Sequence, residues 1–174
     1  MPIISTVLSV AAVVLSILAS LTKGKENIVR ILIFMFLSNF SIAMSYVVQG
    51  TEGINGSITC FLGAVCCIIN FFFTSKEKSV PLWLSAIYAV CFTVANFITG
   101  ISVASVIAVV ASLCFVMSII QKNGAMFRIW SLSNLILWCI FDITQGLYSQ
   151  LISHSILLFF YIMGMIINDR KSKN

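Results

Sequence analysis

Seven long apolar runs fill most of this chain, and short polar or charged links separate them. The runs occupy residues 3–21, 28–48, 54–74, 80–99, 101–120, 125–148 and 151–167. A helix needs about 20 apolar residues to cross the hydrocarbon core of a bilayer. The pattern therefore predicts an all-α integral membrane protein with seven transmembrane helices.

The composition agrees with a chain that faces lipid. Hydrophobic residues make up 60% of the 174 positions and charged residues only 9%, which is too little charge to cover the surface of a soluble domain. The first run has no basic segment before it and no clear small-residue cleavage site after it. We therefore expect this run to be a retained helix and not a removed signal peptide.

The ten basic residues fall on one side when successive links are assigned alternately to the two membrane faces. They are Lys23, Lys25, Arg30, Lys76, Lys78, Lys122, Arg128, Arg170, Lys171 and Lys173. Short links rich in lysine and arginine stay in the cytoplasm, so we expect the N-terminus outside and the C-terminus inside. The basic residues form no patch in sequence, and the net charge of +5 therefore does not indicate a nucleic-acid partner.

The sequence predicts an internal repeat. Residues 7–76 align with residues 105–174 at a constant shift of 98, with 13 identities in 70 positions. The alignment places the first three helices on the last three in the same orientation. We expect one transmembrane domain, residues 1–174, in which two parallel three-helix repeats, about 3–76 and 101–174, are joined by a linker helix at about 80–99.

Leu-Ser-Asn triplets lie near the middle of the second and sixth runs. Their polar members are Ser38, Asn39, Ser133 and Asn134. Under the shift of 98 the triplets are displaced by three residues, close to one helical turn, so we expect them to present the same face. One interpretation is a polar substrate path between the repeats. The alternative is that these side chains bond helices together, each bond contributing ~0.6 to 2 kcal/mol.

Asp142 is a carboxylate inside an apolar run, where it normally faces protein or water or is neutralised. Asp142 and His154 flank the link at 149–150 and enter the bilayer to similar depths, ~7 to 11 Å at 1.5 Å per residue. We expect them to meet as a proton or gating pair, the alternative being a static pair or an Asp142 that is protonated or reached by water. Trp138 and Tyr46 either stack on a ligand or pack within the bundle.

No catalytic, metal or cofactor site is expected. The sequence has one histidine and no HExxH, GxSxG or Walker-type motif, so we expect no enzyme. The six cysteines lie within apolar runs, without a CxxC pair or a nearby histidine. This placement predicts neither a metal site nor a disulfide framework.

Two sets of residues resemble the YgjV-type bacterial inner-membrane proteins. In the second half they are Arg128, Trp138, Asp142 and Gly146, followed by Ser155-Ile156-Leu157-Leu158. In the first half they are Leu37-Ser38-Asn39, Ala43, Tyr46, Gly50 and Gly63-Ala64-Val65. That family looks related to the PQ-loop or SWEET-like transporters, which share the three-one-three plan. The resemblance implies a multi-pass protein of the bacterial cytoplasmic membrane.

These observations favour a small-molecule transporter or carrier that works by alternating access between the repeats. The expected path residues are Ser38, Asn39, Tyr46, Ser133, Asn134, Trp138 and Asp142. The expected partners are membrane lipid and an unidentified small molecule, and the sequence is compatible with a homo-oligomer. The alternative is a non-transporting membrane protein that binds lipid or a partner subunit and uses its polar residues for helix packing.

The charge pattern predicts which lysines a reagent can reach. A membrane-impermeant amine reagent added to intact cells should leave Lys76 and Lys122 unmodified, because both belong to cytoplasmic links. The same lysines should react after the membrane is permeabilised, and peptide mass spectrometry would record both states. Modification of Lys76 in intact cells would contradict the predicted orientation.

Overall fold

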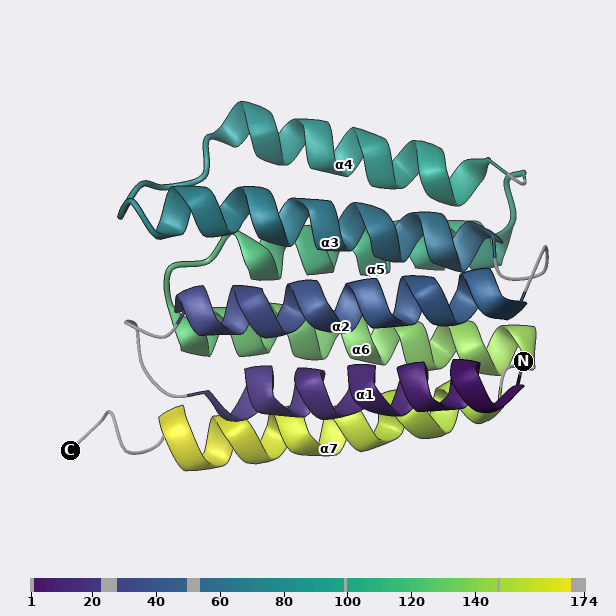
Figure 1. Cartoon of the computed structure of the whole chain (residues 1–174). Coiled ribbons are helices and arrows are strands. Elements are labelled where there is room, and N and C mark those ends of the chain that lie inside the picture. The colour runs from purple at the N-terminus through teal and green to yellow at the C-terminus, as the bar shows by residue number, and fades with distance from the viewer. Residues whose placement is uncertain (1, 23–27, 50–53, 99, 147, 170–174) are drawn as a thin grey trace.

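The computed structural model describes residues 2–22, 28–49, 54–98, 100–146 and 148–169. Within these ranges the chain forms seven α-helices and no strand. The helices are α1 (Pro2–Leu21), α2 (Ile28–Gln49), α3 (Ile54–Thr74), α4 (Leu82–Phe97), α5 (Val103–Ile119), α6 (Gly124–Gln145) and α7 (Tyr148–Asp169). Successive helices run up and down the same bundle (Figure 1). The prediction of seven helices is confirmed for the described residues.

The helices have the length and apolarity of a multi-pass membrane protein. Five of those described, α1, α2, α3, α6 and α7, are long and apolar enough to cross a bilayer. The apolar helices α4 and α5 have 16 and 17 residues, about 24 to 26 Å at 1.5 Å per residue. They are shorter than the predicted runs because the turn between them is wider than expected.

Local capping explains where the helix boundaries differ from the prediction. The sixth helix ends at Gln145 and not at residue 148, because Gly146 adopts a left-handed conformation with φ 69° that terminates it. The seventh helix then begins at Tyr148 and not at residue 151. Before α5, the side chain of Ser102 caps the helix by accepting a hydrogen bond from the Ser105 N–H at 3.0 Å.

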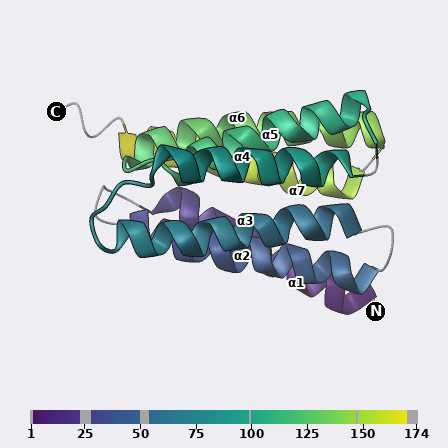
Figure 2. The same cartoon turned by 90° about the horizontal axis from the view of Figure 1, so that it is seen from above.

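The helices form two layers of three. Helices α1, α2 and α3 pack in that order in one layer, and α5, α6 and α7 pack in that order in the other. The layers meet most closely along their edges, where α1 approaches α7 and α3 approaches α5. Helix α4 covers one edge by packing against α3 and α5 (Figures 1 and 2).

One end of the bundle carries the described lysines Lys76, Lys78 and Lys122, which follow α3 and α5, and Arg30 lies in the first turn of α2. We call this the basic end. The turn at Gly146 lies at the opposite end. The described basic side chains are therefore gathered toward one end, as the charge pattern predicted.

Serine side chains hold α1 against α2. Near the opposite end, the hydroxyl of Ser45 lies 2.8 Å from that of Ser5 and 2.9 Å from that of Ser9. Nearer the middle, Ser38 donates to the carbonyl of Ala12 at 2.9 Å and lies 2.7 Å from the hydroxyl of Ser16. Small side chains let the two backbones approach closely, and their hydroxyls supply hydrogen bonds across the helix contact.

The serine contacts predict a difference between two serine-to-alanine variants. Ser38→Ala removes bonds between helices and should lower the free energy of unfolding by ~0.6 to 2 kcal/mol, measured by unfolding in mixed detergent micelles. Ser133→Ala is the matched control, because the Ser133 hydroxyl donates only within its own helix, to Ile129 at 3.2 Å. Equal losses of stability in the two variants would contradict the assignment.

Candidate functional site

Asp142 and His154 form a close polar pair between α6 and α7. Oδ2 of Asp142 lies 2.6 Å from Nδ1 of His154, and the two side chains are 2% and 21% exposed. The predicted contact across the hairpin is therefore confirmed. Gly146 positions the pair, because its N–H bonds back to the carbonyls of Asp142 and Ile143 and closes the helix one turn after the acid.

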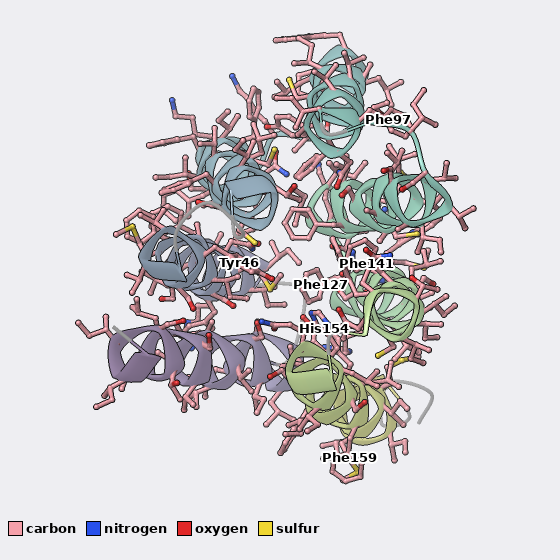
Figure 3. All side chains as sticks on the ribbon, turned by 90° about the vertical axis from the view of Figure 1, so that its right-hand side faces the viewer. Tyr46, Phe97, Phe127, Phe141, His154 and Phe159 are labelled. Carbon is pink, nitrogen blue, oxygen red and sulfur yellow. The ribbon has the colours of Figure 1, made fainter. Side chains whose placement is uncertain are left out.

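Aromatic side chains surround this pair. The ring of Trp138 stacks on that of His154, with centroids 6.2 Å apart and an interplanar angle of 25°. Phe141 meets Trp138 edge-on at 5.2 Å. Tyr46 belongs to the other layer and lies near enough to Asp142 for an electrostatic interaction. Figure 3 shows Tyr46 on α2, with Phe141 and His154 on the α6 and α7 side. We call the ionisable residues Tyr46, Asp142 and His154, together with the packed ring of Trp138, the ionisable cluster.

The geometry of the pair defines where a proton can be exchanged. An ionised Asp142 can only accept, so Nδ1 of His154 donates to it in both the neutral and the protonated ring. In the neutral tautomer the other ring nitrogen, Nε2, then carries no proton.

Ser38 and Asn39 do not point together into a shared space. Ser38 bonds to α1, as described above, whereas the amide nitrogen of Asn39 donates to the carbonyl of Met35 in its own helix at 2.8 Å. The carbonyl oxygen of Asn39 packs against Gly63 of α3, where a Cβ atom would lie 2.9 Å from it. Both side chains are satisfied at helix contacts.

The second triplet faces differently from the first. Asn134 donates to the carbonyl of Ala111 in α5 at 2.7 Å, whereas Asn39 packs against α3. The prediction of a common face for the triplets is therefore wrong. A displacement of three residues falls about 60° short of a full turn, and this rotation is enough to give each asparagine a different neighbour.

The structure buries two polar residues that sequence reasoning did not place in the interior. Asn70 of α3 is fully buried. It donates to the carbonyl of Ile119 at 3.0 Å and accepts from the hydroxyl of Tyr88 at 3.0 Å. Arg128 was counted with the cytoplasmic links, but it lies in α6 and is 2% exposed. It donates to the carbonyl of Thr22 at 3.2 Å.

A spacing signal could have identified Arg128. One stripe of α6 carries Arg128, Ser131, Leu135, Trp138 and Asp142, at alternating intervals of three and four residues. This spacing places them on a single helix face. Four of the five are buried, and Trp138 is half-buried. The stripe therefore runs from a buried cation at the basic end to a buried acid at the opposite end.

Two surface grooves formed by described residues contain none of the predicted path residues. One, of about 540 Å³, lies along α7 between Leu151 and Phe160. Another, of about 180 Å³, lies between α2 and α3 and is lined by Leu32, Phe36 and Phe71 among others. Both are apolar. Among the described residues, no group of three or more histidine, cysteine or acidic side chains could hold a metal ion.

The Asp142 and His154 contact predicts a non-additive pair of substitutions. Asp142→Ala and His154→Ala should each destabilise the protein, and the double variant should lose less than their sum by ~1.5 to 3 kcal/mol, the range for hydrogen bonds to charged groups. Unfolding in mixed micelles would measure the cycle.

A second cycle serves as its control. Thr144→Ala combined with His154→Ala should be additive, because Thr144 donates to Phe141 within α6. Additive behaviour in the Asp142 cycle as well would contradict an energetic coupling.

Compared with known proteins, the chain matches no family model, no curated protein and no solved structure.

Proposed function

We propose that this chain is a small-molecule carrier of the bacterial cytoplasmic membrane that works by alternating access. All seven helices cross the membrane, with the N-terminus outside and the C-terminus in the cytoplasm. The observation that carries the proposal is the ionisable cluster. A buried acid is costly in a membrane and marks a functional site by default, whereas serine and asparagine already supply the bonds between helices.

The arrangement of the layers supports a three-one-three repeat. A two-fold axis along the membrane normal would exchange α1 with α5, α2 with α6 and α3 with α7. Under this axis the contact between α1 and α7 is equivalent to the contact between α5 and α3. The two layers approach each other along these two edges. Helix α4 is outside this scheme and joins the two halves.

A pair of equivalent hydrogen bonds supports the same repeat. Ser20 donates to the carbonyl of Ile17 at 2.8 Å, and Ser118 donates to the carbonyl of Phe115 at 2.7 Å. Donors and acceptors are each related by the shift of 98, and both serines are fully buried. Such agreement of sequence position, bond and burial favours a common origin of the two halves.

The proposed role of the ionisable cluster is to couple a proton to a substrate. Nε2 of His154 takes a proton from the outer medium, and the pair with Asp142 becomes neutral. Substrate binds against Trp138 and Tyr46, which come from different layers. Rocking of the layers then exposes proton and substrate to the cytoplasm. The resemblance to YgjV-type proteins, and through them to SWEET-like transporters, is consistent with this scheme.

A second candidate is a non-transporting protein that binds lipid or a partner subunit. The observation in its favour is that Ser38, Asn39, Ser133 and Asn134 each bond to a nearby carbonyl. Ser38 and Asn134 bond to a neighbouring helix, whereas Asn39 and Ser133 bond within their own helices. The apolar groove along α7 gives this candidate a surface for an acyl chain.

Reconstitution into liposomes distinguishes the two candidates. Purified protein would be placed in liposomes that contain a pH-sensitive dye, and a panel of metabolites would be added with an inward proton gradient. A carrier should give substrate-dependent acidification of the lumen. Asp142→Asn should reduce this signal to that of empty liposomes, because the site can no longer balance a proton on His154.

The control for this assay is Thr144→Ala, an exposed position near the cluster whose hydroxyl bonds within α6. It should keep the signal of the unaltered protein. Liposomes that remain impermeable to the whole panel, with no proton flux, would refute the carrier proposal in favour of the second candidate.

A further inference from the structure

Three polar contacts between the two layers lie toward the basic end. Arg128 of α6 reaches the Thr22 carbonyl at the end of α1, and Asn70 of α3 reaches the Ile119 carbonyl at the end of α5. In the same half of the bundle, the hydroxyl of Tyr161 in α7 lies 3.7 Å from the sulfur of Met35 in α2. Three separate helix pairs are thus joined at one end.

The edge formed by α1 and α7 opens toward the opposite end. The two helices lie close together at the basic end, and α1 diverges from α7 along its length toward its N-terminus (Figures 2 and 3). The ionisable cluster lies at that opposite end. The bundle is therefore tied at the basic end and splayed along this edge where the acid and histidine lie.

The close crossing of α1 and α7 depends on Gly164. A Cβ atom at this position would lie 2.6 Å from the backbone oxygen of Ser20 and 3.5 Å from Cδ of Arg128. The first distance is shorter than real contacts allow, and a backbone oxygen cannot rotate away as a side chain would. Any larger residue at 164 would force the two helices apart at the basic end.

Arg128 occupies this crossing in a favourable electrostatic position. Its guanidinium lies at the C-terminal end of α1, where carbonyl groups lack helical partners and the helix dipole is negative. The residue related to it by the shift of 98, Arg30, is exposed. The same residue type thus occurs in both halves, but only the copy in α6 is buried between the layers.

We propose that Arg128 is the latch of an inner gate, and that the structure represents the state closed at the basic end. The guanidinium holds the end of α1 against α6, and the Gly164 crossing holds α1 against α7. Opening toward the cytoplasm requires Arg128 to leave the Thr22 carbonyl and α1 to separate from α7. The role as a gate rests on the proposed carrier function, whereas the closure itself can be measured without a substrate.

Ser131→Cys provides a reporter of the closed end. Ser131 is 5% exposed and lies one turn from Arg128, beside Tyr161 of α7, and cysteine differs little from serine in size. The reporter variant would be placed in lipid nanodiscs and treated with a charged maleimide. Mass spectrometry would measure the labelling rate at position 131, with the rate of the same variant unfolded in denaturing detergent as reference.

Two substitutions should open the gate in this background. Arg128→Gln removes the charge-assisted hydrogen bond between α6 and the end of α1. Gly164→Ala adds a Cβ atom on α7 that pushes α1 and α7 apart. Arg128→Gln should raise the labelling rate at position 131 by at least ~10-fold, the effect of losing a hydrogen bond to a charged group. Gly164→Ala should raise this rate as well, because its Cβ atom would lie 2.6 Å from the Ser20 oxygen. Because the two changes act from different helices, one of them can fail to fold without removing the test.

Matched controls come from the chain itself. Arg30→Gln makes the same change at the exposed counterpart, and Gly124→Ala adds a Cβ that meets Arg128 at an ordinary 3.5 Å. Neither should alter labelling at position 131. The buried Cys66 of α3 should stay unreactive in every variant, since opening between the layers does not expose its face toward α4.

The outcomes separate gating from loss of structure and from loss of transport. Unchanged labelling at position 131 in both folded variants would overturn the proposal, and so would a parallel rise at Cys66, which indicates general loosening. A carrier assay that finds no substrate would leave the labelling result as it is. Conversely, a failed labelling test would refute the role of Arg128 as a latch. The proposed proton site at Asp142 would still be tested separately by the liposome assay.

Discussion

The buried polar side chains of the described helices take their hydrogen-bond partners largely from within the chain, because the surrounding solvent is lipid. Hydrocarbon offers no hydrogen bonds, and each unsatisfied group costs several kcal/mol. The effect is visible along the first layer, where hydroxyls of α1 and α2 bond to one another and to carbonyls. The same requirement explains the closeness of Asp142 and His154. Satisfying polar groups thus determines which helix faces meet.

Much of the helical architecture could be predicted from the sequence. The apolar runs and the segregation of lysine and arginine each depend on many residues. A wrong interpretation of one residue therefore does not change the predicted number of helices. The contact between Asp142 and His154 was also predictable, because both residues lie at similar distances from one short turn and an acid in lipid needs a partner. These inferences used only length, depth and charge, which do not depend on how side chains pack.

Features set by rotation about a helix axis could not be predicted in the same way. Asn39 and Asn134 bond to different neighbours because a small angular difference changes the facing helix. The burial of Asn70 depends on its partners Tyr88 and Ile119, which come from helices whose positions the sequence does not specify. Arg128 looked like part of a cytoplasmic link, and its burial depends on where α1 ends relative to α6. Gly146 adopts a left-handed conformation that ends α6 at Gln145. The apolar run continues to residue 148, so it did not show where the helix ends.

The buried Asn70 has a mechanical consequence for the molecule. Its amide joins α3 to the end of α5, and its oxygen holds Tyr88 of α4, so three helices share one hinge along a single margin. These bonds oppose sliding of one half past the other along that margin. A motion that kept them intact would have its largest amplitude at the far margin, where α1 and α7 meet at Gly164.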